Sequence, residues 1–425
     1  MASFSFGAGN AAKLLRIPLY AAGRLATILI PRSRDEWVFG CGAGVGDGAL
    51  ALWHEVAAHG HQTVWLAGSP RELSDCAARG IPTVAKHSVR GFWRTARARV
   101  VVITHGFGDV NRYATGGAFI AQLWHGIPLK RIGIDSPETV RVPDGLRRMP
   151  GAGLVRRMIG MLYRATTRRI DLIPAASPLV RGRLESAFSL PESHVPVTGE
   201  PRVDVLSQGT VDTRAAHARR LLTDAVGPTG SAALILYAPT WRDGAADPAV
   251  PSADEWAQII EVLDRRDAVL LVRSHPLGAG AYLPPAPTDR VRSVGSDTIV
   301  DITPALPGVQ VLITDYSSLA FDSALVPLPV VYLAPDLDAY ALRRGLYGRY
   351  QDVAGTDWES DWGGVVAQLD ALLGGPDAAA RAVRTARAAA LSARMHAFDD
   401  GGNTTRVYRA IRARLEPGTA HRRRR

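Results

Sequence analysis

The chain has 425 residues, of which 47% are hydrophobic and 21% are charged, and it carries a net charge of +10 with an isoelectric point near 10.0. This composition excludes a disordered chain, and the length favours two domains over one. The only two cysteines, Cys41 and Cys76, exclude a disulfide framework. The basic surplus predicts an anionic partner, with nucleic acid, phosphorylated small molecules and acidic membranes as the alternatives.

Residues 12–31, AKLLRIPLYAAGRLATILIP, are the first predicted element. The apolar run is short for a membrane span and is interrupted by Arg16, Pro18 and Arg24. Arg24 also divides the apolar region that a signal peptide needs. Two interpretations stay open: a helix lying on a membrane surface, or a first helix packed on its own domain.

From residue 36 onward, apolar strand patterns alternate with helical ones. Strands are predicted in 36–42, 61–68, 97–106, 170–177, 194–201, 231–241, 267–276, 308–318 and 327–335, with helices over 47–60 and 212–227. This alternation predicts an α/β fold with parallel sheets covered by helices on both faces. We place an N-terminal domain at 1–207, a C-terminal domain at 208–416 and a basic tail at 417–425, with ligands beyond the carboxyl ends of the strands.

Polar residues follow several of these strands. QLWHGIPLKRIG (122–133) holds His125 close to Lys130 and Arg131, which suggests either a general base near an anionic substrate or an ordinary half-buried histidine. Other strand ends carry Arg242, Arg273 with His275, and Asp315 with Ser317 and Ser318. Guanidinium groups and a helix start suit phosphate oxygens, although plain serine capping is the alternative at Ser317 and Ser318.

Residues 153–169, GLVRRMIGMLYRATTRR, have apolar residues at helical spacing beside arginines that include Arg156 and Arg157. A basic amphipathic helix of this kind can lie on an anionic membrane. An ordinary helix with a core-facing apolar side is the alternative. The segment is the predicted acceptor or membrane side, together with Lys130 and Arg131.

Several motifs together are similar to those of the CDP-glycerol glycerophosphotransferases, which build the polyol-phosphate chains of teichoic acids. They are LWHGIPLKRIG, GEPRVD, YAPTWRD, RSHP, TDYSSLAFD, RRGLYGRY and FDDGGNTTRVYRAI, in this order over residues 36–412. The resemblance implies a GT-B architecture, in which two Rossmann-like domains face a central cleft. It also implies transfer of glycerol phosphate from CDP-glycerol with release of CMP.

Carried over by position, the resemblance makes His125 the base and His275, Ser317 and Ser318 donor-phosphate contacts, with Asp315 in the same loop. His125 and His275 are the expected catalytic residues. Arg242 and Arg273 join the expected donor-phosphate set because they can stabilise phosphoryl charge. Ile127 and Ser274 depart from the family pattern, and Ser274 could alter the donor pocket. No metal site and no cofactor are expected.

The expected partners are CDP-glycerol or CDP-ribitol as the donor and a lipid-linked saccharide or polyol phosphate as the acceptor. The protein is also expected to bind the anionic surface of the cell membrane on its cytoplasmic face. A nucleotide-sugar glycosyltransferase of the same GT-B fold is the alternative function. A nucleic-acid partner is not expected, because the arginines lie near strand ends or in one amphipathic segment rather than among exposed aromatics.

Overall fold

The computed structural model describes residues 17–142, 151–242, 247–274, 282–374 and 378–416, which form two compact units. Unit 1 comprises residues up to His125, Arg131–Asp204 and the chain from Gly402. Its strands are β1 (Glu36–Phe39), β2 (Gln62–Ala67), β3 (Thr83–Ala85), β4 (Val100–Ile103) and β5 (Phe119–Gln122). Its helices are α2 (Ile17–Leu29), α3 (Asp47–Ala58), α4 (Pro70–Ala78), α5 (Val89–Arg97), α6 (Ala152–Thr167), α7 (Pro178–Phe188) and α15 (Asn403–Leu415).

The strands of unit 1 form one parallel sheet in the order β3-β2-β1-β4-β5. Its strands are short and apolar, as expected for a sheet covered on both faces. Trp37 and Phe39 of β1 and Trp65 of β2 are buried in its core together with Leu52 and Val56 of α3. The order reverses between β1 and β4, because β2 and β3 lie on one side of β1 and the later strands lie on the other.

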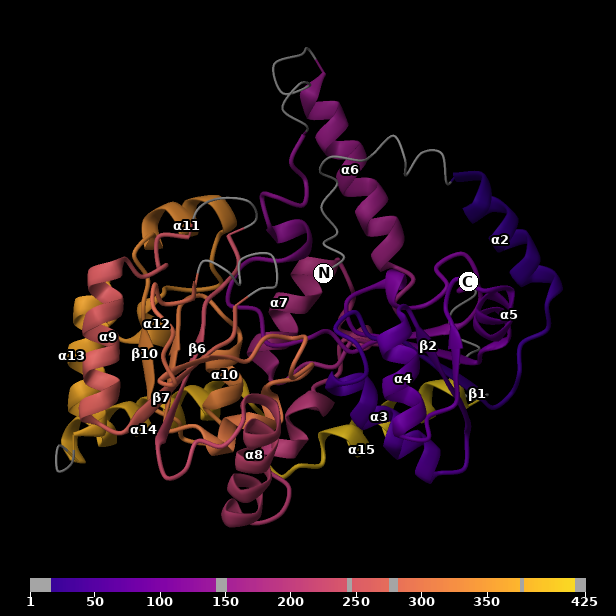
Figure 1. Ribbon diagram of the computed structural model, residues 1–425. Coiled ribbons are helices and arrows are strands. Elements are labelled where there is room, and N and C mark those ends of the chain that lie inside the picture. The colour runs from indigo at the N-terminus through magenta and orange to yellow at the C-terminus, as the bar shows by residue number, and fades with distance from the viewer. Residues whose placement is uncertain (1–16, 143–150, 243–246, 275–281, 375–377, 417–425) are drawn as a thin grey trace. The chain divides into compact units, whose positions relative to one another are not determined.

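Helix α15 belongs to unit 1 although it comes from the end of the chain. Val407, Tyr408 and Ile411 are buried in the core of the first sheet, and α15 packs along α3 (Figure 1). The carboxylate of Asp204 accepts hydrogen bonds from the backbone N–H groups of Asn403 and Thr404 at 3.0 and 2.7 Å, at the start of this helix. The expected C-terminal domain at 208–416 was therefore drawn too long, because its last part, from Gly402 onward, belongs to unit 1.

Unit 2 comprises Val205–Gly401 and the short segment Gly126–Lys130. Its strands are β6 (Ala233–Ala238), β7 (Ala268–Val272), β8 (Val291–Ser293), β9 (Val311–Thr314) and β10 (Val330–Tyr332). Its helices are α8 (Val211–Val226), α9 (Ala253–Arg265), α10 (Leu319–Ser323), α11 (Leu337–Arg344), α12 (Gln351–Ala354), α13 (Trp362–Leu373) and α14 (Ala378–Met395). Segment 126–130 lay within the expected N-terminal domain, but the N–H of Tyr347 donates to the carbonyl of Leu129 at 2.8 Å and Lys130 pairs with Leu346 in an antiparallel bridge.

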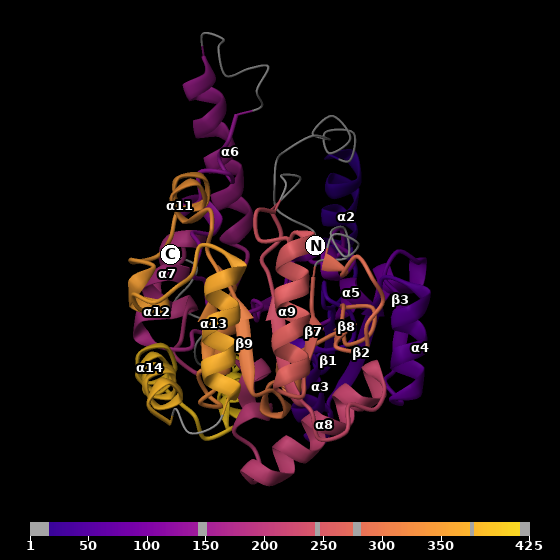
Figure 2. The same cartoon turned by 60° about the vertical axis from the view of Figure 1, so that its left-hand side comes forward.

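The second sheet is also parallel, in the order β10-β9-β6-β7-β8. Helices α9 and α13 lie side by side against it, as both views show (Figures 1 and 2). Their residues Trp256 and Trp362 are buried with Tyr237 of β6. The strand order reverses between β6 and β9, so each unit has its own reversal point.

Local sequence signals explain where many helices begin. The hydroxyl of Ser69 accepts from the N–H of Glu72 and precedes Pro70 at the start of α4. Ser252 and Glu255 form a reciprocal capping box at the start of α9. Such caps satisfy backbone N–H groups that have no partner inside the helix. The helices expected over 47–60 and 212–227 are confirmed as α3 and α8.

Two predicted strands are wrong. Segments 170–177 and 194–201 make only isolated bridges, Ala121 with Leu172 and Ala175 with Val197. Their prolines, Pro174 and Pro196, have no N–H to donate to a ladder, which limits strand formation. The sheet instead gains β5, whose residue Gln122 opens the segment that carries His125.

Candidate active site

The two sheets each place polar side chains at the point where the strand order reverses. In open parallel sheets, ligands bind beyond the carboxyl ends of the strands at such a point, because neighbouring loops there turn in opposite directions. In unit 1 these loops follow β1 and β4, and in unit 2 they follow β6 and β9.

In unit 2, Arg242 is the centre of a buried ionic cluster. Its guanidinium binds Asp336 through two hydrogen bonds of 3.0 and 3.1 Å, and Asp315 through one of 2.8 Å. It also lies over the rings of Tyr316 and Tyr340, 5.1 and 5.2 Å from their centroids. Burial would lower the pKa of Arg242, but the nearby carboxylates outweigh it and raise that pKa above its ordinary value. The cation is therefore held by protein groups.

The carboxylate of Asp315 also accepts its hydrogen bonds from protein groups. It is only 2% exposed, and it accepts hydrogen bonds from the backbone N–H of Thr240 at 3.0 Å and from the Thr240 hydroxyl at 2.6 Å. Its remaining oxygen accepts from Arg242. These contacts tie the loop after β6 to the loop after β9. Asp315 and Arg242 thus organise the strand ends, and direct contact of either with a donor phosphate gains no support.

Arg273 follows β7 and has a similar internal role. Its guanidinium donates to the backbone carbonyls of Val294, Ile299 and Val300 at 3.0, 2.8 and 3.1 Å. Burial lowers the pKa of Arg273, against the opposing effect of Asp301. The side chain holds the loop after β8, which argues against the expected phosphate contact. His275, the other predicted residue after β7, lies outside the described residues.

Ser317 and Ser318 lie after β9 and remain partly exposed. The hydroxyl of Ser317 accepts a hydrogen bond from the N–H of Leu319 at 3.2 Å, whereas Ser318 makes no side-chain cap. Helix α10, which follows, has only five residues, so its dipole is small. The capping alternative therefore applies to Ser317, while the Ser318 hydroxyl is not used to cap the helix.

Lys130 lies with the unit 2 residues rather than with the expected acceptor side. Burial, followed by the charge of Arg344, lowers its pKa to about 8, with Asp315 opposing and Arg242 adding to the shift. Arg242 is already paired with Asp315 and Asp336, so in this region it is the positive charge of Lys130 that favours an anionic ligand. Arg131, its neighbour in the sequence, is exposed and belongs to unit 1.

In unit 1, His125 follows β5 next to an unusual backbone position. Trp124 has a left-handed φ of 63°, which a bulky side chain rarely adopts. The Nδ1 atom of His125 lies 3.4 Å from the carbonyl oxygen of Thr104, and its ring lies against the rings of Trp124 and His105. Strained residues of this kind are concentrated at functional sites, which supports a functional position for His125.

Sequence reasoning missed His105 and the glycine-rich loop 40–48 (GCGAGVGDG) after β1. Both follow buried strands, the same signal that singled out Arg273 and Ser317. In this loop the carboxylate of Asp47 pairs with Arg202 at 3.1 Å at the start of α3. Within the GEPRVD motif (199–204), Arg202 is thus engaged in an ion pair, while Asp204 accepts hydrogen bonds at the start of α15.

Helices α2 and α6 expose large apolar side chains. On α2, Ile28 and Leu29 are 73% and 75% exposed, and on α6 Leu154 is 70% exposed. Figure 1 shows α6 extending away from the sheet of its own unit. The predicted basic residues Arg156 and Arg157 are exposed on the same helix. The core-facing alternative therefore holds only for the face of α6 that buries Ile159 and Tyr163.

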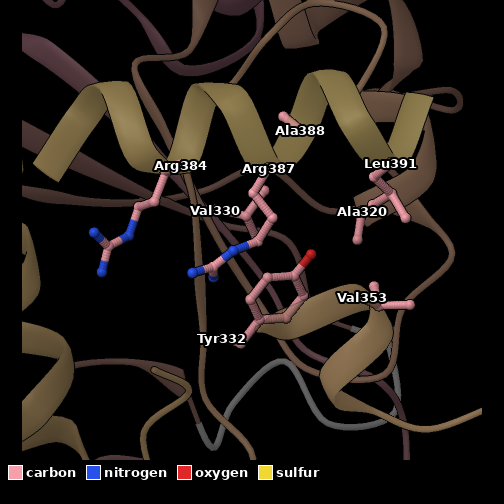
Figure 3. Close-up of a pocket in the computed structure, with 8 residues that line it drawn as sticks. All are labelled: Ala320, Val330, Tyr332, Val353, Arg384, Arg387, Ala388 and Leu391. Carbon is pink, nitrogen blue, oxygen red and sulfur yellow. The ribbon is translucent and has the colours of Figure 1, made fainter. Parts of the chain in front are cut away.

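The enclosed space beside α14 is too small for a substrate. Figure 3 shows its lining, with Arg384 and Arg387 extending from α14 and the ring of Tyr332 beside Arg387. The cavity holds about 10 Å³, room for no more than one water molecule. Both arginines pair with Asp357, at 3.1 and 2.6 Å. This region is structural.

Neither a metal-binding cluster nor a membrane-spanning helix occurs among the described residues. No group of three or more His, Cys, Asp or Glu side chains there is placed to hold a metal ion. Among the helices over the described ranges, none has the length and hydropathy to cross a bilayer.

Comparison with known sequences identifies the family to which the chain belongs. The family model for CDP-glycerol:poly(glycerophosphate) glycerophosphotransferase matches residues 38–413. A teichoic acid glycerol-phosphate transferase of Staphylococcus aureus (strain NCTC 8325 / PS 47) is 27% identical over 347 residues, 80% of this chain and 84% of that protein. A teichoic acid glycerol-phosphate primase of Bacillus subtilis (strain 168) is 31% identical over 121 residues, 28% of this chain and 30% of that protein.

Comparison with solved structures confirms the predicted fold class. The wall teichoic acid polymerase TagF matches with a TM-score of 0.72 at 21% identity, over 95% of each chain. At this level of identity the likeness shows the fold alone.

Proposed function

The chain belongs to the family of CDP-glycerol:poly(glycerophosphate) glycerophosphotransferases, and from this premise we propose that it transfers glycerol phosphate from CDP-glycerol to a hydroxyl of a membrane-linked acceptor. The acceptor oxygen attacks the β-phosphorus of the donor, the phosphoanhydride bond breaks, and CMP leaves. The observation that carries the proposal is the family match over residues 38–413. It favours this reaction over sugar transfer by a GT-B glycosyltransferase.

We assign His125 as the general base. A polyol hydroxyl is a weak nucleophile near neutral pH and reacts faster when a positioned base removes its proton. Its position after β5, next to the strained backbone of Trp124, supports this role. His275 remains a further predicted catalytic residue from its motif.

For the donor phosphates we assign Lys130, Ser317 and Ser318. Lys130 is close enough to Asp315, Arg242 and Arg344 for their charges to affect its titration, which supports a shift of Lys130 from the acceptor side to the donor side. Arg242 and Asp315 hold the surrounding loops in place. Stabilising charge on the phosphoryl oxygens and on departing CMP needs no covalent intermediate.

We further propose that α2 and α6 bind the cytoplasmic face of the membrane. Apolar residues Ile28, Leu29 and Leu154 are exposed on these helices, and α6 adds Arg156 and Arg157. Exposed leucines beside arginines suit the interface of an anionic bilayer. Such docking would bring the enzyme to an acceptor whose lipid cannot leave the membrane.

The proposed reaction is tested by donor choice. The purified chain is incubated with a synthetic lipid-linked acceptor and, separately, CDP-glycerol, CDP-ribitol, or UDP- and CDP-linked sugars, and the products are identified by mass spectrometry. We expect addition of glycerol phosphate with one CMP released per transfer. Addition of a sugar, with no product from either CDP-polyol, would contradict the proposal. The ribitol arm is needed because a ribitol-phosphate polymerase of Staphylococcus aureus is also a relative, 27% identical over 189 residues.

A further inference from the structure

His105 lies at the reversal point of the first sheet, directly beside His125. Strands β4 and β5 are parallel neighbours with Ile103 opposite Gln122, and each is followed within three residues by one of the two histidines. The rings are stacked with their centroids 4.2 Å apart and their planes only 2° from parallel. The stack is thus a direct consequence of strand register.

Several contacts hold His105 in place. Its backbone N–H donates to Oδ2 of Asp109 at 2.7 Å, and the same carboxylate oxygen accepts from the N–H of Thr104 at 2.9 Å. Its Nδ1 atom lies 2.8 Å from the hydroxyl of Thr104. These bonds fix both the backbone and the ring of His105.

The glycine-rich loop packs directly against the His105 ring. A Cβ atom at Gly42 would lie 2.6 Å from Cγ of His105, closer than real side-chain contacts allow, so only glycine fits there. The ring of His105 therefore contacts both Gly42 and His125, and it has little freedom to rotate. A fixed ring can in turn restrict the ring stacked on it.

We infer that His105 is a positioning residue for His125, holding the plane of the base's ring in line with the acceptor hydroxyl. The inference rests on the proposed role of His125. In the reaction the hydroxyl proton moves to His125, the new oxygen–phosphorus bond forms and CMP leaves, while His105 keeps its own protons throughout.

The electrostatic surroundings of His105 agree with this role. Burial lowers its pKa, although the charges of Asp109 and Asp47 oppose the shift and Arg202 adds to it. His105 therefore stays neutral near neutral pH. A neutral ring can remain stacked on His125 after His125 takes a proton, whereas two stacked cations would repel each other.

The first test separates the ring from its hydrogen bonds. We expect His105→Phe, which keeps a flat ring, to retain kcat within about threefold of wild type. His105→Asn and His105→Ala remove the ring, and we expect kcat to fall about 10- to 100-fold, because small misplacements of a catalytic group have effects of this size. KM for CDP-glycerol should stay within about twofold in all three. The control His54→Ala changes an exposed histidine on α3 and should leave kcat unchanged.

The second test asks whether His105 acts through His125. In a double-mutant cycle, adding His105→Ala to His125→Ala should reduce the residual rate by less than about threefold, because the ring to be positioned is already absent. Residual rates are followed with radiolabelled CDP-glycerol, and melting temperatures show whether each variant is folded. If His105→Ala fails to fold, the comparison of His105→Phe with His105→Asn decides.

The outcomes separate the inference from the proposed function. Multiplicative losses in the double variant, or wild-type kcat in His105→Asn, would overturn the positioning role of His105. A fully active His125→Ala would instead overturn the base assignment itself. Loss of activity in His125→Ala with normal activity in every folded His105 variant would reject only the inference about His105.

Discussion

Arg242 and Asp315 form a buried ion pair with 2.8 Å between Nη1 and Oδ2. Their exposed fractions are 6% and 2%, and 72 residues separate them in the chain. The pair joins the loops that follow β6 and β9, the two strands between which the order of the second sheet reverses. It thus stabilises the part of unit 2 to which we assign the donor phosphates.

We predict that Arg242→Ala destabilises the protein strongly. Removing one partner leaves the buried carboxylate of Asp315 and the half-buried carboxylate of Asp336 uncompensated, and breaking a buried pair typically costs about 3–5 kcal/mol. Urea unfolding should show the lower stability. Arg349→Ala, which removes a fully exposed arginine paired with Asp352, is the control and should change stability little. Unchanged stability together with a large loss of donor affinity in Arg242→Ala would restore the phosphate role.

We predict that donor use weakens as the pH rises through about 8. The pKa of Lys130 is lowered to about 8, so its ammonium loses its proton near this pH and its attraction for phosphate with it. The measurement is kcat/KM for CDP-glycerol against pH, which reports groups of the free enzyme. In Lys130→Arg the guanidinium stays charged, so this decline near pH 8 should disappear. A decline that persists in Lys130→Arg would show that another group causes it.

We predict that His125→Ala lowers kcat about 10²- to 10⁴-fold, the usual effect of losing a general base. Binding of CDP-glycerol, measured by calorimetry, should remain near wild type because the donor contacts are assigned to other residues. Turnover within a few-fold of wild type would remove His125 from the mechanism.

We predict that the double variant Ser317→Ala/Ser318→Ala raises KM for CDP-glycerol about tenfold or more. Hydrogen bonds to charged groups contribute about 1.5–3 kcal/mol each, enough for a change of this size. Loss of the Ser317 hydroxyl also removes its bond to the N–H of Leu319, so the melting temperature should fall slightly. A lower melting temperature with unchanged KM would indicate that the serines only cap α10.

We predict that exchange of four arginines on or next to α6 for serine releases the protein from vesicles. The four exposed residues are Arg156, Arg157, Arg164 and Arg168. Each basic residue near an anionic surface contributes about 1 kcal/mol, so binding should also weaken with salt. Flotation with phosphatidylglycerol vesicles measures the release, and turnover of a soluble acceptor analogue should be retained.

The matched control for this prediction removes the same charge elsewhere. It replaces Arg220, Arg265, Arg349 and Arg409, which are exposed elsewhere in the chain. Equal flotation of the α6 variant and wild type would leave α6 without a membrane role.

The strand-end motifs were predictable because their signal is local. Apolar runs such as ALILYA (233–238) and VLIT (311–314) are followed at once by polar residues. In a parallel sheet the carboxyl ends of the strands share one edge, so order along the chain is enough to bring such residues together. The same rule applied to every strand would also have singled out His105 after β4.

The partners of those side chains were not predictable in the same way. Arg242 binds Asp336, 94 residues further along the chain, and Arg273 binds carbonyls of a loop that begins 21 residues later. A guanidinium after a strand has the same local pattern whether it contacts a carboxylate, a carbonyl or a phosphate. The choice depends on which groups the fold brings near it.

The order of residues along the chain was sufficient to establish the alternating α/β fold, the positions of the strand-end motifs and the family resemblance, because each depends on residues close together in the chain. The folded structure was needed to show that α15 belongs to unit 1, that Lys130 lies with Arg344 and Asp315, and that part of α6 is exposed. These outcomes depend on packing between distant segments, since burial and electrostatic partners are properties of the folded chain. The stacked pair of His105 and His125 joins both kinds of information: each histidine follows a strand in the sequence, and strand register makes them neighbours.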